Sequence, residues 1–273
     1  MTHPIRVILR RTFLIGQIVL LLPIGWFMYH VFMPRNFSSK TAESLPLSLS
    51  SGAFETLYYA AEHPKGIIIV ATGDGGWSDQ WEEPVARHAA ASGFVVGGWD
   101  CRKFADTRSF DQAKLVEAFN AAVTAVRTKA GLPVNCPVWF TGWSTGAEWA
   151  LAAAASPNRE KYLVGILMAA PSERSRYGIS ENDLLGLPVL GADSYALADL
   201  APALHGVRVV QFAGELDVLD DTLWIESLHA ATPHRLVVIP GLPHDMDGAG
   251  ERFLSEFDMG IQWTLDTPLP TSK

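Results

Sequence analysis

The pentapeptide Gly142-Trp143-Ser144-Thr145-Gly146 constrains the local fold of this chain more tightly than any other feature. It lies between an apolar run at residues 137–140 and an alanine-rich stretch at residues 147–155. This order predicts a strand, a sharp turn and a helix, which is the context in which G-x-S-x-G forms a nucleophile elbow. Because the turn is tight, the residues that flank the serine must be small. Ser144 would then project from the sheet beside a helix N-terminus, which favours developing negative charge.

Strand-like and helix-like segments alternate along most of the chain, which has room for one large α/β domain. The run Gly66–Ala71 is continuously apolar, as a doubly buried parallel strand should be. Residues 110–129 place apolar side chains at helical spacing. Such alternation predicts a mostly parallel sheet with helices on both faces. We expect strands at 54–61, Gly66–Ala71, Phe94–Trp99, 137–141, 162–169, 207–213 and 235–239, and helices at 81–92, 110–129, 147–155 and 250–263. Residues 171–205 are irregular and could form a small lid.

The N-terminal segment predicts a membrane anchor. Residues 13–33 contain no Asp, Glu, Lys or Arg and are long enough to span a bilayer. Arginines precede this stretch, so residues 1–12 would stay in the cytoplasm and the body would be periplasmic, on a bacterial inner membrane. A cleaved signal peptide is the alternative, although no clean cleavage site follows the stretch. We expect a linker at 34–52, within which 45–49 could form a first strand, and a catalytic domain at 53–273.

The charge of the body argues against nucleic-acid binding. Five of the 21 basic residues lie in the first forty positions, where there is no acid, so the remainder carries 16 basic and 29 acidic side chains. Nucleic-acid binding needs a basic footprint, which this body lacks. An acidic body is compatible with a cationic substrate, although a solvated surface that aids solubility is the more ordinary explanation.

The two cysteines do not predict a disulfide. Cys101 follows the strand Phe94–Trp99, whereas Cys136 precedes the strand at 137–141. Opposite edges of a parallel sheet are separated by about five residues at roughly 3.3 Å each, which exceeds the reach of a disulfide. The chain has no C-x-x-C and no His/Cys cluster with zinc spacing, so we predict neither a metal nor another cofactor.

Partners for Ser144 follow two later strands. Catalytic groups in parallel sheets lie just past the carboxyl ends of the strands. Asp217 follows the strand at 207–213 and His244 follows the strand at 235–239, in the order Ser…Asp…His of α/β-hydrolases. Asp217 is preferred to its neighbours because it comes directly after the strand, and His234 precedes its strand at the wrong edge. The competing acids are Glu215, Asp220 and Asp221.

An oxyanion hole needs two aimed backbone N–H groups. The residue after the nucleophile, Thr145, supplies one of them. The loop Thr72-Gly73-Asp74-Gly75-Gly76-Trp77 follows the strand Gly66–Ala71, where lipases carry a glycine-rich motif. We assign the second donor to the Asp74 amide, with Gly75 the near alternative. A phosphate-binding loop is disfavoured because no Gly-Lys-Ser/Thr follows.

Three motifs together resemble the VirJ/AcvB family of bacterial virulence-associated proteins. They are the Gly-Asp-Gly-Gly-Trp loop, the segment Gly98-Trp99-Asp100-Cys101 and the elbow, and the resemblance extends from about residue 66 to His244. The chain departs from the family in Cys101, where serine is usual, in Trp143, where tyrosine is usual, and in holding one domain where some members hold two. The resemblance implies an α/β-hydrolase fold and a periplasmic enzyme that removes amino acids from aminoacylated phosphatidylglycerol. Other members of the family are linked to secretion of virulence factors.

Several residues near the predicted mouth are candidates for substrate binding. Gly75, Trp77 and Trp143 are the main ones, and Trp81 and Trp99 flank the same region, although tryptophans packed beneath loops are at least as ordinary. Four acids could bind the ammonium group of an aminoacyl substrate, or could be surface and capping residues. They are Asp74, Asp106, Glu148 and Asp245.

The sequence therefore predicts an anchored serine esterase, with Ser144 as nucleophile, His244 as base and Asp217 as the acid that orients it. The substrate would be an ester, with a phospholipid among the candidates. Its acyl and alcohol parts, the oligomeric state and any protein partner stay open. A hydrolase-fold binding or assembly protein of the cell envelope, with little turnover, is the alternative from a different class.

Overall fold

A computed structural model describes residue 29, residue 33 and residues 37–219, 222–228 and 232–270 of the chain. The predicted membrane span at residues 13–33 lies almost entirely outside this set. Among the helices that are described, none combines the length and the apolar character that crossing a membrane requires.

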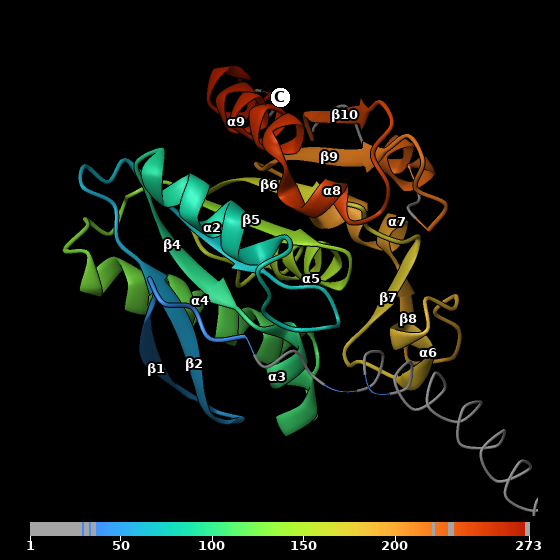
Figure 1. The fold of residues 1–273 in the computed structure, drawn as a ribbon, viewed down its shortest axis with the longest axis horizontal. Coiled ribbons are helices and arrows are strands. Elements are labelled where there is room, and N and C mark those ends of the chain that lie inside the picture. Colours follow the sequence, from blue (N-terminus) through green and yellow to red (C-terminus); the bar gives the residue numbers. More distant parts are fainter. Residues whose placement is uncertain (1–28, 30–32, 34–36, 220–221, 229–231, 271–273) are drawn as a thin grey trace, which may run out of the picture. The chain divides into compact units, whose positions relative to one another are not determined.

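The body is built on an eight-stranded sheet with the order β1-β2-β4-β3-β5-β6-β9-β10 (Figure 1). The two hairpin strands at the start, β1 and β2, are antiparallel to each other, and β2 is antiparallel to β4. From β4 to β10 all neighbours are parallel, as the sequence predicts. The strands are β1 Glu43–Leu49, β2 Gly52–Tyr59, β3 Gly66–Ala71, β4 Phe94–Trp99, β5 Val138–Trp143, β6 Leu163–Ala169, β9 Arg208–Gly214 and β10 His234–Ile239.

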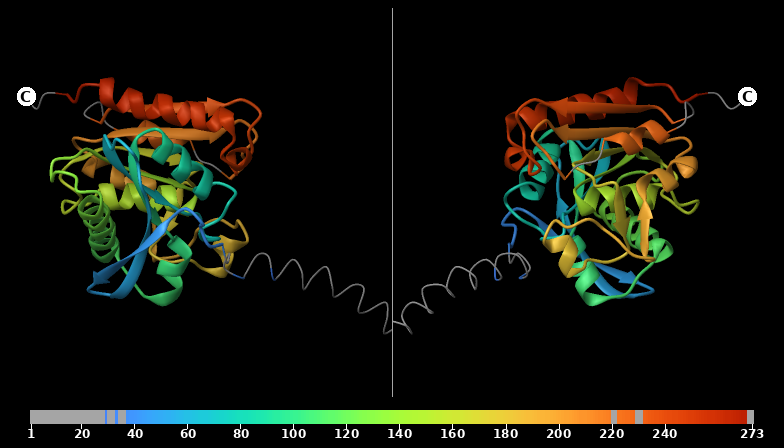
Figure 2. Two further views of the ribbon diagram at one scale, coloured as in Figure 1. Left: turned by 60° about the vertical axis from the view of Figure 1, so that its left-hand side comes forward. Right: turned by 90° about the vertical axis from the view of Figure 1, so that its right-hand side faces the viewer.

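Helices cover both faces of this sheet (Figures 1 and 2). Alternate residues of β3 enter different cores, because successive side chains of a strand point to opposite faces. Ile67 and Ile69 belong to the core that α4 and α5 cover, whereas Ile68 and Val70 belong to the core that α2 and α9 cover. The helices are α2 Glu82–Ala91, α3 Cys101–Thr107, α4 Gln112–Lys129, α5 Thr145–Ala154 and α9 Glu251–Asp266, with short turns at η2 Leu223–Ser227 and α8 Met246–Ala249.

The sheet begins earlier than the predicted domain boundary at residue 53. Strand β1 lies within the segment 34–52 that we expected to be a linker, and pairs with β2 from Glu43 opposite Tyr58 to Leu49 opposite Gly52. Its alternating pattern is the cause: Leu47 and Leu49 are buried in the core beside α4, while Pro46 and Ser48 are exposed. The expected first strand at 45–49 is therefore present, and it is longer.

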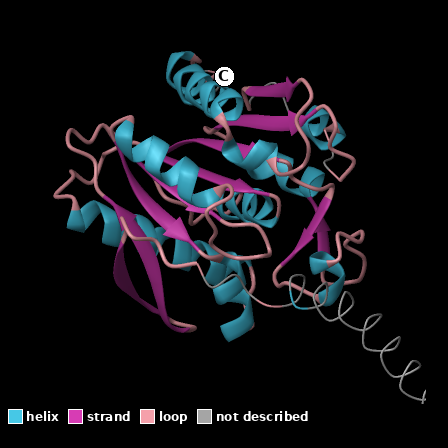
Figure 3. Ribbon diagram, in the orientation of Figure 1, coloured by secondary structure: helices cyan, strands magenta, loops and turns pink. Residues whose placement is uncertain are grey.

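Residues 171–205 are more regular than their sequence indicates (Figure 3). Two short strands, β7 Arg174–Arg176 and β8 Ser194–Ala196, form a separate antiparallel pair. The connection between them carries α6 Glu181–Leu184, and β8 leads directly into α7 Leu197–Leu200 and the turn η1 Ala201–Ala203. The segment is thus a small β-hairpin with a long, partly helical connection.

The cysteines lie where the predicted strand order places them. Cys101 begins α3 just after β4, and Cys136 precedes β5. Both are buried and both are free thiols. Burial raises the pKa of each thiol, which keeps them in the unreactive protonated form.

Candidate active site

The predicted nucleophile elbow is present at the end of β5. Ser144 lies between β5 and α5 with φ 52° and ψ −123°, outside the ordinary helical and strand regions. Its backbone N–H donates to the Ala169 carbonyl at 2.9 Å, and its own carbonyl accepts from Ala147 at 2.9 Å. A non-glycine residue in this conformation costs about 1–3 kcal/mol, so the surrounding packing must hold it.

The flanking glycines are required by close backbone contact. A Cβ atom at Gly142 would lie 2.3 Å from the carbonyl carbon of Gly146. A Cβ atom at Gly146 would lie 2.3 Å from the Ala71 oxygen. These distances are far shorter than any non-bonded contact, so the start of α5 sits directly on the ends of β5 and β3. The small-residue prediction for both positions is confirmed.

Asp217 and His244 form a hydrogen-bonded pair. The Nδ1 atom of His244 lies 2.7 Å from the Oδ2 atom of Asp217. The Asp217 side chain is fully buried, whereas that of His244 is 24% exposed. A carboxylate at Nδ1 fixes the tautomer that carries a proton there, which leaves Nε2 free to accept one. The arrangement is that of the acid and base in a serine triad.

Backbone hydrogen bonds between two loops hold Asp217 and His244 close together. The Leu216 N–H donates to the Leu242 carbonyl at 2.9 Å, so the loop after β9 lies against the loop after β10. Gly214 permits the contact, because a Cβ atom there would be 2.4 Å from the Leu242 oxygen. The competing acid Glu215 has another role, since its carboxylate accepts the Gly241 N–H at 2.7 Å. The other competitors, Asp220 and Asp221, lie outside the described residues.

A cavity of about 520 Å³ opens at this edge of the sheet. Its lining includes both Ser144 and His244, which come from strands separated in the sequence by about one hundred residues. A volume of this size is typical of small-molecule sites. The same lining holds the predicted oxyanion residues Asp74 and Thr145 and the predicted substrate-binding residue Trp143. Trp143 also touches the base: its indole N–H donates to the His244 carbonyl at 2.8 Å.

Buried carboxylates anchor the glycine-rich loop that carries Asp74. Glu82 accepts the Gly73 N–H at 3.3 Å and the Ser78 hydroxyl at 2.6 Å. Asp100 accepts the Trp77 N–H at 3.2 Å, and burial raises the pKa of its carboxyl. Since the Gly73 amide is engaged by Glu82, Asp74 is the first residue of the loop that reaches the cavity. This role of Glu82 could not be predicted from the sequence, because an acid in the first turn of a helix is an ordinary stabilising feature.

The prediction that Trp77 binds substrate is wrong. The indole of Trp77 is buried, stacks on Tyr59 with ring centres 6.0 Å apart, and donates to Glu83 at 3.1 Å. Gly98 makes the room for it, since a Cβ atom there would be 2.6 Å from the ring. Trp81 and Trp99 are also core residues.

Gly75 does not line the cavity either, so Trp143 is the only one of these candidates that does. The glycine belongs to the anchored loop but lies beyond the part of it that borders the opening. Trp77, Trp81 and Trp99 do not line the cavity.

Of the four acids considered for ammonium binding, Asp74 and Glu148 line the cavity. Glu148 lies one turn after Ser144 and accepts the Ser172 N–H at 3.0 Å. Burial raises the pKa of Glu148 to about 7. Asp106 instead pairs with Arg102 at 2.8 Å, and Asp245 caps α8, so these two fit the surface and capping roles. Within the described part of the chain, no three His, Cys, Asp or Glu side chains are grouped so that they could hold a metal ion.

The fold agrees with known structures. The chain has the α/β-hydrolase fold. It is similar to the α/β hydrolase GrgF from Penicillium, with 16% identity, a TM-score of 0.64 and coverage of 82% of this chain and 97% of that one. It is also similar to Est1E from Butyrivibrio proteoclasticus, with 12% identity, a TM-score of 0.60 and coverage of 82% and 99%. A dienelactone hydrolase from Anabaena variabilis matches with 17% identity, a TM-score of 0.58 and coverage of 84% and 98%.

No protein-family model matches the chain, and neither does any curated protein sequence. The structural neighbours therefore support the α/β-hydrolase fold, while the resemblance to the VirJ/AcvB family stays a prediction. At these identities the likeness establishes the fold alone.

The acid–base pair predicts a large effect of Asp217→Asn. The substitution keeps the size of the side chain but favours the wrong histidine tautomer, as it does in serine proteases. We expect the rate at which a fluorophosphonate probe labels Ser144 to fall by about 10³-fold or more. Glu215→Gln on the same loop is the matched control and should lower the rate far less. Comparable losses in both variants would mean that Asp217 acts only through loop structure.

The raised pKa of Glu148 predicts that the stability of the folded protein depends on pH. Its carboxyl stays protonated in the folded protein up to about pH 7, whereas the unfolded chain ionises near its ordinary value of 4.5. The folded state binds the extra proton between these values, so stability falls as the pH rises through this window. Relative to Glu148→Gln, the free energy of unfolding of the wild type should drop by about 3 kcal/mol across it. Denaturant unfolding at a series of pH values measures this, and parallel curves for the two proteins would contradict it.

Proposed function

We propose that this protein is a serine hydrolase that cleaves carboxylic esters. The observation that carries the proposal is the 2.7 Å hydrogen bond between Asp217 and His244, together with the cavity that His244 and the elbow residue Ser144 both line. A buried acid, a histidine with one free ring nitrogen and a serine in a left-handed turn together make an activated nucleophile.

The chemistry divides into two steps. Ser144 Oγ attacks the ester carbonyl and passes its proton to His244 Nε2, while Asp217 stabilises the imidazolium. The oxyanion is held by the amides of Asp74 and Thr145, and its collapse expels the alcohol, which takes the proton from His244. A water molecule then attacks the acyl-enzyme with His244 as base. The carboxylic acid leaves and Ser144 recovers its proton.

The substrate that the motif resemblance suggests is an aminoacyl ester of phosphatidylglycerol. Two acids of the cavity lining, Asp74 and Glu148, offer carboxyl oxygens to an ammonium group, and Glu148 would carry a negative charge above about pH 7 or once a bound cation favours its ionisation. The membrane span expected at residues 13–33 would hold the catalytic body at an extracytoplasmic bilayer surface. Anchoring of this kind raises the effective concentration of a lipid substrate without any new contact.

The test compares the wild-type protein with Ser144→Ala. We expect the wild type to hydrolyse aryl esters and to be labelled by a fluorophosphonate, and the variant to lose both, with a fall in rate of about 10⁴-fold or more. Lysyl- and alanyl-phosphatidylglycerol in the same assay test the finer assignment. Equal activity in both proteins would contradict the proposal. Failure of the wild type to react with any ester or probe would favour a binding or assembly role in the cell envelope.

A further inference from the structure

One wall of the cavity is apolar and continues outward into solvent. Four large aliphatic side chains line the cavity together with Ser144: Leu187, Leu190, Val218 and Leu219. They are nevertheless 50%, 72%, 91% and 46% exposed. We call these four residues the apolar rim. Single exposed apolar side chains are normal on a protein surface, but a cluster at the mouth of a cavity marks a site of interaction.

The rim comes from two loops that lie beside each other. Leu187 and Leu190 belong to the connection between α6 and β8, whereas Val218 and Leu219 belong to the loop after β9 that also carries Asp217. A Cβ atom at Gly186 would be 3.8 Å from a methyl group of Leu219, so the two loops lie close together here. The two halves of the apolar rim therefore lie near each other in the lining of one cavity, and one half belongs to the loop of the catalytic acid.

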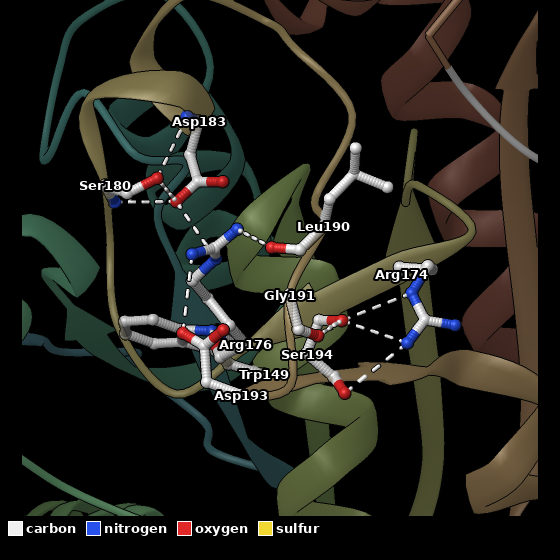
Figure 4. Close-up of polar contacts among 9 residues, drawn as sticks. All are labelled: Trp149, Arg174, Arg176, Ser180, Asp183, Leu190, Gly191, Asp193 and Ser194. Atoms are coloured by element: carbon white, nitrogen blue, oxygen red, sulfur yellow. Dashed lines mark hydrogen bonds and ion pairs between the residues drawn. The ribbon is translucent and has the colours of Figure 1, made fainter.

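Arg176 holds the α6–β8 connection in place (Figure 4). Its guanidinium lies between Asp183 at 3.5 Å and Asp193 at 3.4 Å, and donates to the Leu190 carbonyl at 3.1 Å. The side chains of Arg176 and Asp183 are only 14% and 10% exposed, so solvent screens this pair less than it screens an ordinary surface pair. Arg176 of β7 thus holds Asp183 and Asp193 at the two ends of the connection, and Leu190 of the apolar rim between them. A binding wall fixed in advance loses less conformational entropy when a ligand arrives.

We propose that the apolar rim is the subsite for an extended alkyl chain of the ester substrate. The proposal rests on the proposed ester hydrolysis, because it places the chain in the cavity where Ser144 would attack. A cavity of about 520 Å³ is larger than a short acyl group requires, and its lining holds both Ser144 and the four exposed aliphatic side chains of the rim. A flexible chain can follow such a surface from the reacting carbonyl outward, and each buried methylene contributes about 0.8 kcal/mol.

The chain could belong to the acid or to the alcohol half of the ester, and the substrates distinguish the two. One series consists of p-nitrophenyl esters from acetate to octanoate, and the other of n-alkyl acetates from methyl to octyl, all below the concentration at which they aggregate. Full burial of a methylene corresponds to about a fourfold gain in kcat/KM. We expect kcat/KM to rise by at least about 10²-fold from the shortest to the longest member of one series.

Variants of the rim identify where the chain lies. Leu187→Ser and Val218→Ser should each reduce the ratio of long-chain to short-chain kcat/KM by about tenfold, chiefly through KM. Leu187→Met keeps the apolar volume and should restore the ratio. Leu265→Ser on α9 is the matched control, because Leu265 is 49% exposed and does not line the cavity. It should leave the ratio within about twofold of the wild type.

A binding experiment separates this inference from the catalytic proposal. Calorimetric titration of 1-octanol and 1-butanol into Ser144→Ala needs no turnover, and octanol should bind at least tenfold more tightly. Leu187→Ser in the same background should remove that difference. Flat chain-length profiles in both series, or equal binding of the two alcohols, would overturn the inference while leaving ester hydrolysis intact. Chain-dependent binding without any hydrolysis would overturn the proposed function alone.

Discussion

Helix α5 starts directly against the end of β3, with no side chain between them. The contact exists because Gly146 has no Cβ, and a methyl group there would overlap the Ala71 oxygen. It forces the chain between β5 and α5 through a single residue, which is why Ser144 adopts φ 52°. Two backbone hydrogen bonds compensate the strain at this residue. Ser144 donates one to β6 and accepts the other from the first turn of α5. The position of the nucleophile, its exposure and its proximity to a helix N-terminus all follow from this one close approach.

The remainder of the site depends on buried acids that accept hydrogen bonds from named donors. Asp217 accepts from His244, Glu148 from the Ser172 amide, Glu82 from the Gly73 amide and Asp100 from the Trp77 amide. A buried carboxylate is costly unless it is bonded in this way. Each of these acids therefore fixes the segment that it bonds. Together these acids position His244, the segment that leads into the β7–β8 hairpin and the glycine-rich loop around one cavity.

Much of the site could be predicted from the sequence, because catalytic groups in parallel sheets lie just past the carboxyl ends of the strands. Ser144, Asp217 and His244 each follow a recognisable apolar strand, and the rule brings them to one edge. Trp77 could not be placed in this way. Its burial depends on Gly98 of β4 and on Glu83 of α2, and no local pattern around Trp77 indicates either contact. The β7–β8 hairpin was missed for a similar reason, since its three-residue strands are too short to show alternation and are held by Arg176 through long-range bonds.

The most direct test of the account is a crystal structure of the catalytic body after reaction with a small organophosphonate. Phosphorus should be bonded to Ser144 Oγ, with a phosphonyl oxygen at about 3 Å from the backbone nitrogens of Asp74 and Thr145. The Asp217–His244 bond should be retained, and the phosphonate substituent should lie toward Leu187 and Val218. A phosphonate on another residue, or an oxygen that meets neither amide, would contradict the account.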